Sequence, residues 1–259
     1  MAILKVEHLR GGWDGKLVLD DISFQVGKGE ILAVVGKSGC GKTTLMHYLL
    51  GLVEPWKGRI LFKDEDIWSD PENLQKARGR WGVTFQSGAL LGNLTLLENV
   101  MLPLREYTDL SDSDLKTVAY VKLDTVGLAD FADSSPLEVS GGMQKRAGLA
   151  RAMALDPEVL FFDEPSAGLD PVTSASLDDL IKTINTSLGT TVVIVTHELA
   201  SIFAISDRVI MLDPQEHGII AAGTADELKN SSNDKRVIAF FRRNPSAEKG
   251  VTENVNDRK

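Results

Sequence analysis

Cysteine, long apolar runs and excess positive charge are what this sequence lacks. One cysteine, Cys40, stands among 259 residues, so no disulfide can form within the chain, and such a composition favours a reducing compartment such as the cytosol. The apolar runs VLFFDE (159–164) and TTVVIVT (190–196) are far shorter than the about 20 residues that a membrane-spanning helix needs. The opening residues, MAILKVEHLRGGWDG, show no charged segment before an apolar one, so we expect no signal peptide.

The charge balance argues against an anionic partner. Lysine and arginine number 28 against 37 aspartates and glutamates, which gives a formal net charge of -9. Nucleic acids and anionic lipid surfaces would repel such a chain. We therefore expect no nucleic-acid partner, and we expect any role at a membrane to pass through another protein.

The remaining composition, 43% hydrophobic and 25% charged, is typical of a globular domain, and the order of its patterns predicts an α/β fold. Alternating segments at 4–11 and 19–29 predict antiparallel edge strands, and the uniformly apolar EILAVVG (30–36) predicts a buried strand. Further elements are expected as strands at 58–67, 159–164 and 190–197, a helix at 174–188, and a closing hairpin at 207–213 and 218–224. The stretch 87–155 reads as mostly helical, and the polar residues after 230 predict a weakly ordered tail.

The strongest local motif follows the predicted buried strand. Residues 36–44, GKSGCGKTT, fit the pattern G-x-x-x-x-G-K-[ST] in full, and they open a helix expected over 42–53. Glycines let such a loop wrap around phosphate oxygens, while backbone N–H groups and the helix dipole favour the negative charge. Lys42 can reach the β- and γ-phosphates, and the Thr43 hydroxyl can bind Mg²⁺. The predicted phosphate-binding residues are Gly36, Lys37, Ser38, Gly39, Cys40, Gly41, Lys42, Thr43 and Thr44.

VLFFDE supplies acidic residues at the end of an apolar strand. Ligands of open α/β sheets bind at the carboxyl ends of the strands, where Asp163 would lie. Asp163 is therefore expected to hold Mg²⁺ through water, and Glu164 to polarise an attacking water. Acidic residues at a strand end can also be plain caps, but the preceding phosphate loop favours the catalytic interpretation.

A second glycine turn raises the question of why one chain would need two phosphate sites. VSGGMQKRAGLARA begins at Val139, and a helical pattern starts near Met143, directly after two glycines. A backbone turn followed by a helix N-terminus can bind an anion. Residues 36–44, however, already provide such a site.

The motif order resembles that of the ATP-binding cassette (ABC) ATPases: the P-loop, then VSGGM, VLFFDE, SAGLD and VTH. The resemblance covers nearly the whole chain, residues 2–227. It implies hydrolysis of ATP with Mg²⁺ by two subunits that stack head to tail. It also implies a P-loop NTPase (RecA-like) core with an antiparallel β edge at 1–86 and 156–230, an inserted helical subdomain at about 87–155, and a C-terminal tail at 231–259.

The head-to-tail arrangement gives the second turn a role. In the family, the signature loop of one subunit closes over the ATP in the P-loop of the other. By resemblance, Ser140, Gly141 and Gly142 contact the γ-phosphate of the partner's ATP. The family sequence is LSGGQ, whereas this chain has Val139 and Met143 at the two ends. The serine and both glycines remain, so the departure puts a glutamine-mediated contact in doubt and not catalysis.

Other residues match family positions one by one. By resemblance, Trp13 stacks on the adenine and Gln86 senses the γ-phosphate and Mg²⁺. Asp170 lies in the loop that crosses the dimer interface, and His197 hydrogen-bonds the γ-phosphate. The implied metal ligands are Thr43, Gln86 and Asp163, and the implied catalytic residues are Glu164, His197 and Gln86. Taken alone, Trp13 also fits a half-buried edge-strand residue, and His197 a structural histidine after a strand.

Four stretches narrow the resemblance to a subfamily. FQSGALLGNLTLLENVMLPLRE, SGGMQKRAGLARA, DEPSAGLDPVTSASLDDLI and THELASIFAISDRVIMLD together look like the ATPase of Mla-type (maintenance of lipid asymmetry) transporters. That resemblance implies a subunit on the cytoplasmic face of the inner membrane, held there by an integral-membrane permease. It would power phospholipid transport between inner and outer membranes with an MCE-domain partner, and a small accessory subunit is also suggested. Two alternatives stay open: the ATPase of a polar-solute importer, and a regulatory ABC ATPase that does not transport.

The tail carries paired aromatic residues, Phe240 and Phe241, among basic residues and before Pro245. Exposed paired phenylalanines are unfavourable unless something covers them. Either the rings pack on the chain's own core, or the segment docks on the second ATPase subunit or on an accessory protein.

Overall fold

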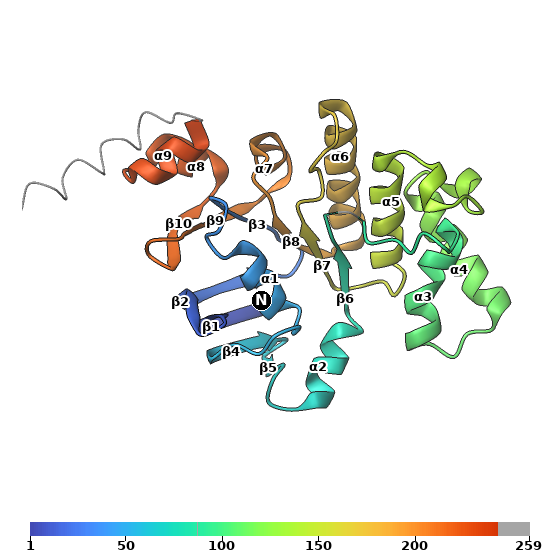
Figure 1. The fold of residues 1–259 in the computed structure, drawn as a ribbon, viewed down its shortest axis with the longest axis horizontal. Coiled ribbons are helices and arrows are strands. Elements are labelled where there is room, and N and C mark those ends of the chain that lie inside the picture. The colour runs from blue at the N-terminus through green and yellow to red at the C-terminus, as the bar shows by residue number, and fades with distance from the viewer. Residues whose placement is uncertain (87, 243–259) are drawn as a thin grey trace, which may run out of the picture.

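The computed structural model describes residues 1–86 and 88–242. Within them the chain forms two β-sheets and a surrounding set of helices (Figure 1). The expected α/β class is confirmed. The smaller sheet is antiparallel, with the order β2-β1-β4-β5. Its strands are β1 (Ala2–Trp13), β2 (Lys16–Gly27), β4 (Lys57–Phe62) and β5 (Glu65–Asp66).

The larger sheet has the order β10-β9-β3-β8-β7-β6. Its strands are β3 (Ile31–Gly36), β6 (Trp81–Thr84), β7 (Val159–Asp163), β8 (Thr191–Val195), β9 (Arg208–Asp213) and β10 (Gly218–Gly223). Its neighbouring strands are parallel from β9 to β6, and β9 and β10 form the expected antiparallel hairpin. The parallel strands therefore end at one edge of the sheet, which receives the segments that follow Gly36, Thr84, Asp163 and Val195.

Helices connect the strands. They are α1 (Lys42–Leu49), α2 (Pro71–Arg78), α3 (Leu96–Tyr107), α4 (Asp112–Thr125), α5 (Gly141–Ala152), α6 (Pro171–Leu188), α7 (Leu199–Ile205), α8 (Ala225–Ser231) and α9 (Lys235–Arg242). Short 3₁₀ turns at Ala129–Phe131 and Pro136–Glu138 precede α5. In the described part of the chain, none of these helices is both long enough and apolar enough to cross a bilayer.

The stretch expected to be helical contains α3, α4 and α5, which gather at the end of the molecule away from the antiparallel sheet (Figure 1). A capping box starts α3: the Thr95 hydroxyl accepts from the Glu98 N–H, and the Glu98 carboxylate accepts from the Thr95 N–H at 2.8 Å. The buried Asn99 side chain accepts from the Leu91 N–H at 2.8 Å and donates to the Thr95 carbonyl at 2.9 Å. This amide therefore fixes the segment between β6 and α3.

The larger sheet separates two hydrophobic cores. Ile31, Ala33 and Val35 of β3 belong to the core on one face, and Leu32 and Val34 to the core on the other. The first core extends into α3, α4 and α5, and the second into the antiparallel sheet. Each fully buried apolar side chain contributes roughly 1.5–3 kcal/mol. The strand that leads into the phosphate loop is thus held from both sides, as its continuous apolar run predicted.

The end of the described chain differs from the sequence expectation. The prediction of a weakly ordered tail is wrong for α9, because this helix buries an apolar face: Val237 and Phe241, four residues apart, are 0% and 3% exposed. The Phe241 ring packs edge-on against Phe203 of α7, with 6.1 Å between ring centres. Packing on the chain's own core is therefore the correct interpretation for Phe241. Pro245 and the remainder of the tail lie outside the described residues.

Phe241→Ala should lower the free energy of unfolding by about 3–5 kcal/mol, because it removes a buried ring and leaves a cavity. Arg242→Ala, one residue further on the exposed side of α9, removes only exposed hydrogen bonds to the Lys229 carbonyl at 3.3 Å and should change the free energy of unfolding by less than about 1 kcal/mol. Urea denaturation followed by circular dichroism measures both variants. If the two substitutions had equal effects, α9 would not be part of the core.

Candidate nucleotide-binding site

A cavity of about 690 Å³ opens at the edge where the parallel strands end. It is lined by Val18, Gly36, Lys37, Ser38, Gly39, Gly41, Lys42, Thr43, Thr44, Gln86, Asp163, Glu164, Val195, His197 and Phe240. The structure thus brings together most of the predicted phosphate loop with Gln86, Asp163, Glu164 and His197. These residues are separated by up to about 160 positions in the chain but share one sheet edge.

The loop between β3 and α1 has a shape that requires glycine. At Gly36, with φ of 146°, a Cβ atom would lie 2.5 Å from the Leu212 carbonyl oxygen and 2.6 Å from the Cys40 sulfur. At Gly41, with φ of 103°, a Cβ would meet Leu19 at 2.7 Å. The loop therefore stays narrow and leads directly into the N-terminus of α1. Free N–H groups there favour an anion, and no acidic side chain stands in the first turn of this helix.

Lys42 lies inside this loop. Its ammonium group donates to the carbonyl oxygens of Gly36 at 2.8 Å and Lys37 at 3.2 Å. The cation is therefore held over the concave side of the loop, where phosphate oxygens can replace the carbonyls as acceptors. Cys40, by contrast, does not line the cavity: it is buried beneath the loop, and burial raises the pKa of its thiol.

Asp163 ends β7 beside the loop. Burial raises the pKa of its carboxyl group, the negative charge of Glu164 raises it further, and His47 and Lys42 oppose the shift. A cation near Asp163 would therefore stabilise the ionised carboxylate. No group of three histidine, cysteine or acidic side chains in residues 1–86 and 88–242 could hold a metal ion. Mg²⁺, however, is commonly held by one or two carboxylates together with waters and substrate phosphates, and Asp163 with the Thr43 hydroxyl suits that mode.

Glu164 and His197 form a hydrogen-bonded pair, with 2.8 Å between Glu164 Oε1 and His197 Nδ1. The Glu164 backbone has φ of 49°, a left-handed conformation that is costly for a residue with a side chain. Its N–H still bonds the Val195 carbonyl at 2.8 Å, so the turn begins directly at the strand end. The second carboxylate oxygen, Oε2, is buried and has no hydrogen-bond partner in the described structure. A buried acceptor without a partner is unfavourable, so this oxygen would gain from a movement that lets a water reach it.

Helix α5 fastens the loops that follow β6 and β7, a role that the sequence analysis missed. The Arg151 guanidinium donates to the carbonyls of Gly88 at 2.9 Å and Ala89 at 2.8 Å, close to Gln86. The Lys145 ammonium donates to the carbonyls of Pro165 and Ala167, both at 2.6 Å, just beyond Glu164. Both cations lie in the motif SGGMQKRAGLARA, so their place in the chain was visible but their backbone partners were not.

The second glycine turn lies away from the cavity. Ser140 caps α5, which begins at Gly141, two residues before Met143, near which its start was expected: the serine hydroxyl accepts from the Met143 N–H at 3.3 Å. A Cβ on Gly142 would meet Thr173 of α6 at 2.6 Å. Asp170 caps α6 and accepts from the N–H groups of Val172 and Thr173 at 3.0 Å. Ser140, Gly141, Gly142 and Asp170 therefore form a neighbourhood of their own, and none of them lines the cavity.

Trp13 also stands outside the lining residues. It ends β1, is 41% exposed, and donates from Nε1 to the Thr44 hydroxyl at 2.9 Å. Its ring packs edge-on against the His47 ring, with 5.7 Å between the two ring centres. The ring is thus attached to the end of the phosphate loop and leaves one side open.

Apolar side chains of the lining were not foreseen as site residues. Val18 comes from β2, Val195 from the end of β8, and Phe240 from α9. No motif surrounds Val18, and Phe240 follows the phosphate loop by almost 200 residues, so local patterns could not reveal either contact.

Comparisons with known proteins agree with this geometry. The family model described as "ABC transporter" matches residues 19–167. The intermembrane phospholipid transport system ATP-binding protein MlaF of Haemophilus influenzae is 38% identical over 241 residues, which cover 93% of this chain and 90% of that protein. MlaF of Escherichia coli is 41% identical over 227 residues, or 87% and 83% of the two chains. A probable ribonucleotide transport ATP-binding protein, mkl, of Mycobacterium leprae is 39% identical over 81% of this chain and 60% of its own length.

Solved structures show the same fold. The cbiO1 protein from Clostridium perfringens, part of an ABC transporter complex, superposes with a TM-score of 0.81 at 28% identity and covers 97% of this chain and 99% of its own. A dimeric bacterial ABC transporter cassette gives a TM-score of 0.77 at 28% identity, covering 85% and 98%.

Glu164→Gln should stop ATP hydrolysis while ATP still binds, because glutamine keeps the shape of the side chain but cannot accept a proton as a carboxylate does. Phosphate release and equilibrium ATP binding measure the two properties separately. Lys42→Ala is the matched contrast, since it removes the ammonium group held over the concave side of the loop and should weaken binding as well. A Glu164→Gln protein with wild-type turnover would show that another group activates the water.

Proposed function

Because the chain belongs to the ABC transporter family, we propose that it is the ATP-hydrolysing subunit of a transporter that moves phospholipid between two membranes. The observation that carries the ATPase part is the cavity in which the phosphate loop meets Asp163, Glu164 and His197. The observation that carries the phospholipid part is the similarity to MlaF along most of both chains.

Binding of the triphosphate is assigned to the loop and the helix that follows it. Lys42 exchanges its carbonyl acceptors for β- and γ-phosphate oxygens, and the N–H groups at the start of α1 cover the remaining charge. Thr43, Gln86 and Asp163 are the residues that would hold Mg²⁺. When bound, Mg²⁺ neutralises charge on the β- and γ-phosphate oxygens. Trp13, held at Thr44, is assigned to the adenine.

Hydrolysis is assigned to Glu164 and His197. A water that donates a hydrogen bond to the Glu164 carboxylate attacks the γ-phosphorus, the bond from that phosphorus to the β,γ-bridging oxygen breaks, and the carboxylate takes the proton of the water. His197 holds the Oε1 atom of that carboxylate at 2.8 Å, so it fixes the direction in which Glu164 points. The strained backbone at Glu164 serves the same end, since it turns the side chain from the strand toward the cavity.

The second glycine turn completes the site of a partner subunit in this proposal. Within one chain, Ser140, Gly141 and Gly142 lie beside α6 and outside the cavity, so a contact with ATP requires another copy. The N-terminus of α5 would point its free N–H groups at the partner's γ-phosphate. Solved relatives include a dimeric cassette, which supports a homodimer with Asp170 near the interface.

Ser140→Arg should abolish hydrolysis in the assembled transporter and leave ATP binding to the monomer intact, because the added side chain would fill the partner's γ-phosphate site. Turnover of the reconstituted complex and ATP binding by the isolated chain are the two measurements. Equal loss of monomer binding would place the second turn in the chain's own site.

The proposed partners follow from what this chain cannot do by itself when a lipid is moved. Moving a lipid out of a bilayer exposes acyl chains at a cost of about 0.8 kcal/mol per CH₂. A chain with a net charge of -9 is repelled by an anionic membrane and offers no shelter for such chains. We therefore assign it to the cytoplasmic face of the inner membrane, bound to an integral-membrane permease. An MCE-domain protein and a small accessory subunit complete the proposed complex.

A polar-solute importer is the alternative that one comparison supports. The mycobacterial relative is named for ribonucleotide transport, but the shared region covers 60% of that protein, whereas the MlaF matches cover 83–90% of theirs. Because the MlaF matches cover more of both chains, they favour phospholipid as the transported substrate.

The chain should co-purify from membranes with a permease and an MCE-domain protein, and the complex should contain phospholipid. Mass spectrometry of the complex identifies proteins and lipids, and ATPase assays with and without phospholipid test whether the lipid stimulates turnover. Recovery of a solute-binding protein, with neither an MCE-domain partner nor bound phospholipid, would overturn the lipid assignment and leave the ATPase assignment standing.

A further inference from the structure

Phe240 borders the nucleotide cavity from a part of the chain outside every motif of the site. It lies on α9 and contributes to the cavity lining together with residues of the phosphate loop. Its neighbour Phe241 is buried in the core, with 5.2 Å between the two ring centres in an edge-on arrangement. Phe240 itself is half-buried, so one side of its ring packs on the core and another faces the cavity.

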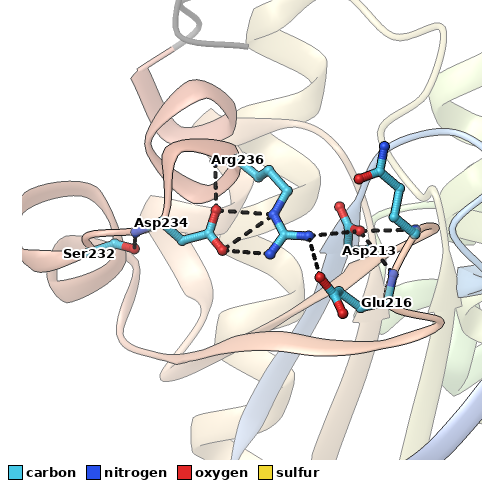
Figure 2. A network of polar contacts seen from close by, with 6 residues as sticks. Asp213, Glu216, Ser232, Asp234 and Arg236 are labelled. Atoms are coloured by element: carbon cyan, nitrogen blue, oxygen red, sulfur yellow. Dashed lines mark hydrogen bonds and ion pairs between the residues drawn. The ribbon is translucent and has the colours of Figure 1, made fainter. Parts of the chain in front are cut away.

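An ion-pair network fixes α9 in this place (Figure 2). The Arg236 guanidinium bonds Asp234 at 2.8 Å, and it bonds both Asp213 and Glu216 at 3.1 Å. The Asp213 side chain is 5% exposed and also accepts from the Gln215 and Glu216 N–H groups. These carboxylates raise the pKa of Arg236, as expected for a cation with such partners. The helix carrying Phe240 is thereby tied to the turn between β9 and β10.

The β9–β10 turn also contacts the strand that carries Val18, the other half-buried apolar residue of the cavity lining. His217, in the β9–β10 turn, has its Nδ1 atom 3.2 Å from the Val18 carbonyl oxygen, and its own carbonyl accepts from the Asp20 N–H at 2.7 Å. The segments that carry Val18 and Phe240 are therefore connected to the same turn, although 222 positions separate the two residues in the chain. Val195, the third apolar residue of the lining, is almost fully buried.

Different residues of the cavity lining suit different parts of a nucleotide. Phosphates require N–H groups and cations, which the loop, α1 and Lys42 provide. Half-exposed apolar side chains cannot replace the hydration of a phosphate, but they can cover the ribose and base. Val18 touches the loop near Gly41, at its α1 end, where Thr44 also holds Trp13.

We propose that Phe240 contacts the nucleoside part of the bound nucleotide and that α9 is a fixed wall of its own chain's nucleotide site. This inference rests on the proposed ATPase function. It makes Phe240 a determinant of affinity for the nucleoside, whereas the triphosphate is held by the phosphate loop, the start of α1 and the residues assigned to Mg²⁺.

The test compares two probes on the full chain: Mg-AMP-PNP, a non-hydrolysable ATP analogue, and Mg-tripolyphosphate, which has the phosphates but no nucleoside. Calorimetry gives the Kd of each. Phe240→Ala should raise the Kd for AMP-PNP about fivefold or more, as expected for loss of a base–aromatic contact, and leave the Kd for tripolyphosphate unchanged. Phe240→Leu, which preserves most of the apolar packing, should give a smaller change in the same direction.

Phe203→Ala is the matched control. Phe203 belongs to the same aromatic cluster through Phe241 but does not line the cavity, so its loss should weaken α9 packing without changing either Kd. An unchanged AMP-PNP affinity in both Phe240 variants would overturn the inference, and so would equal losses for the two probes or for Phe203→Ala. Lys42→Ala reports separately on the proposed function: if it bound both probes as the wild type does, the cavity would not be the nucleotide site at all.

Discussion

The site depends on the alignment of parallel strand ends at one edge of the larger sheet. Val195 pairs with Val34 on one side and with Asp163 on the other, so the strands that lead to the phosphate loop, the acidic pair and the histidine end in one row. The hydrogen bond from the Glu164 N–H to the Val195 carbonyl extends this row by one residue before the backbone turns. Because β3 is packed from both faces, the row cannot shift without disturbing two cores. A polar site of short, directional contacts is thereby placed at the edge of a sheet that is packed from both faces.

One chain brings the phosphate loop, Asp163, Glu164 and His197 into one cavity, but its second glycine turn lies outside that cavity. Cations of α5 link the two regions mechanically: Arg151 holds the loop after β6, and Lys145 holds the loop after Glu164. The helix whose N-terminus faces outward is therefore the helix that supports the loops around the cavity. Any movement of α5 that accompanies dimer closure acts on those loops through fixed hydrogen bonds, which gives a physical basis for coupling between the two ends.

The sequence could predict what is local and could not predict what depends on burial. The phosphate loop, Asp163 and Glu164 follow from short patterns, because the strand, the turn and the side-chain chemistry are adjacent in the chain. Val18 and Phe240 reach the site only through distant packing and carry no pattern of their own, and the backbone partners of Lys145 depend on the same kind of packing. The helix α9 was obscured by its basic residues, which hide an apolar face at the spacing of Val237 and Phe241. Asp234, which accepts from the Arg236 N–H at 2.7 Å, was the available start signal for that helix.

The strand order also determines when β3 can pair with its neighbours during synthesis on the ribosome. The neighbours of β3 in the sheet are β8 and β9, which begin at Thr191 and Arg208, whereas β3 itself ends at Gly36. At synthesis rates of ~5–20 residues per second, a nascent chain therefore carries an apolar strand with two unpaired edges for on the order of ten seconds. During that interval the phosphate loop does not yet have the larger sheet beneath it. The topology itself therefore delays the pairing of β3, and with it the assembly of the cavity, until most of the chain has been made.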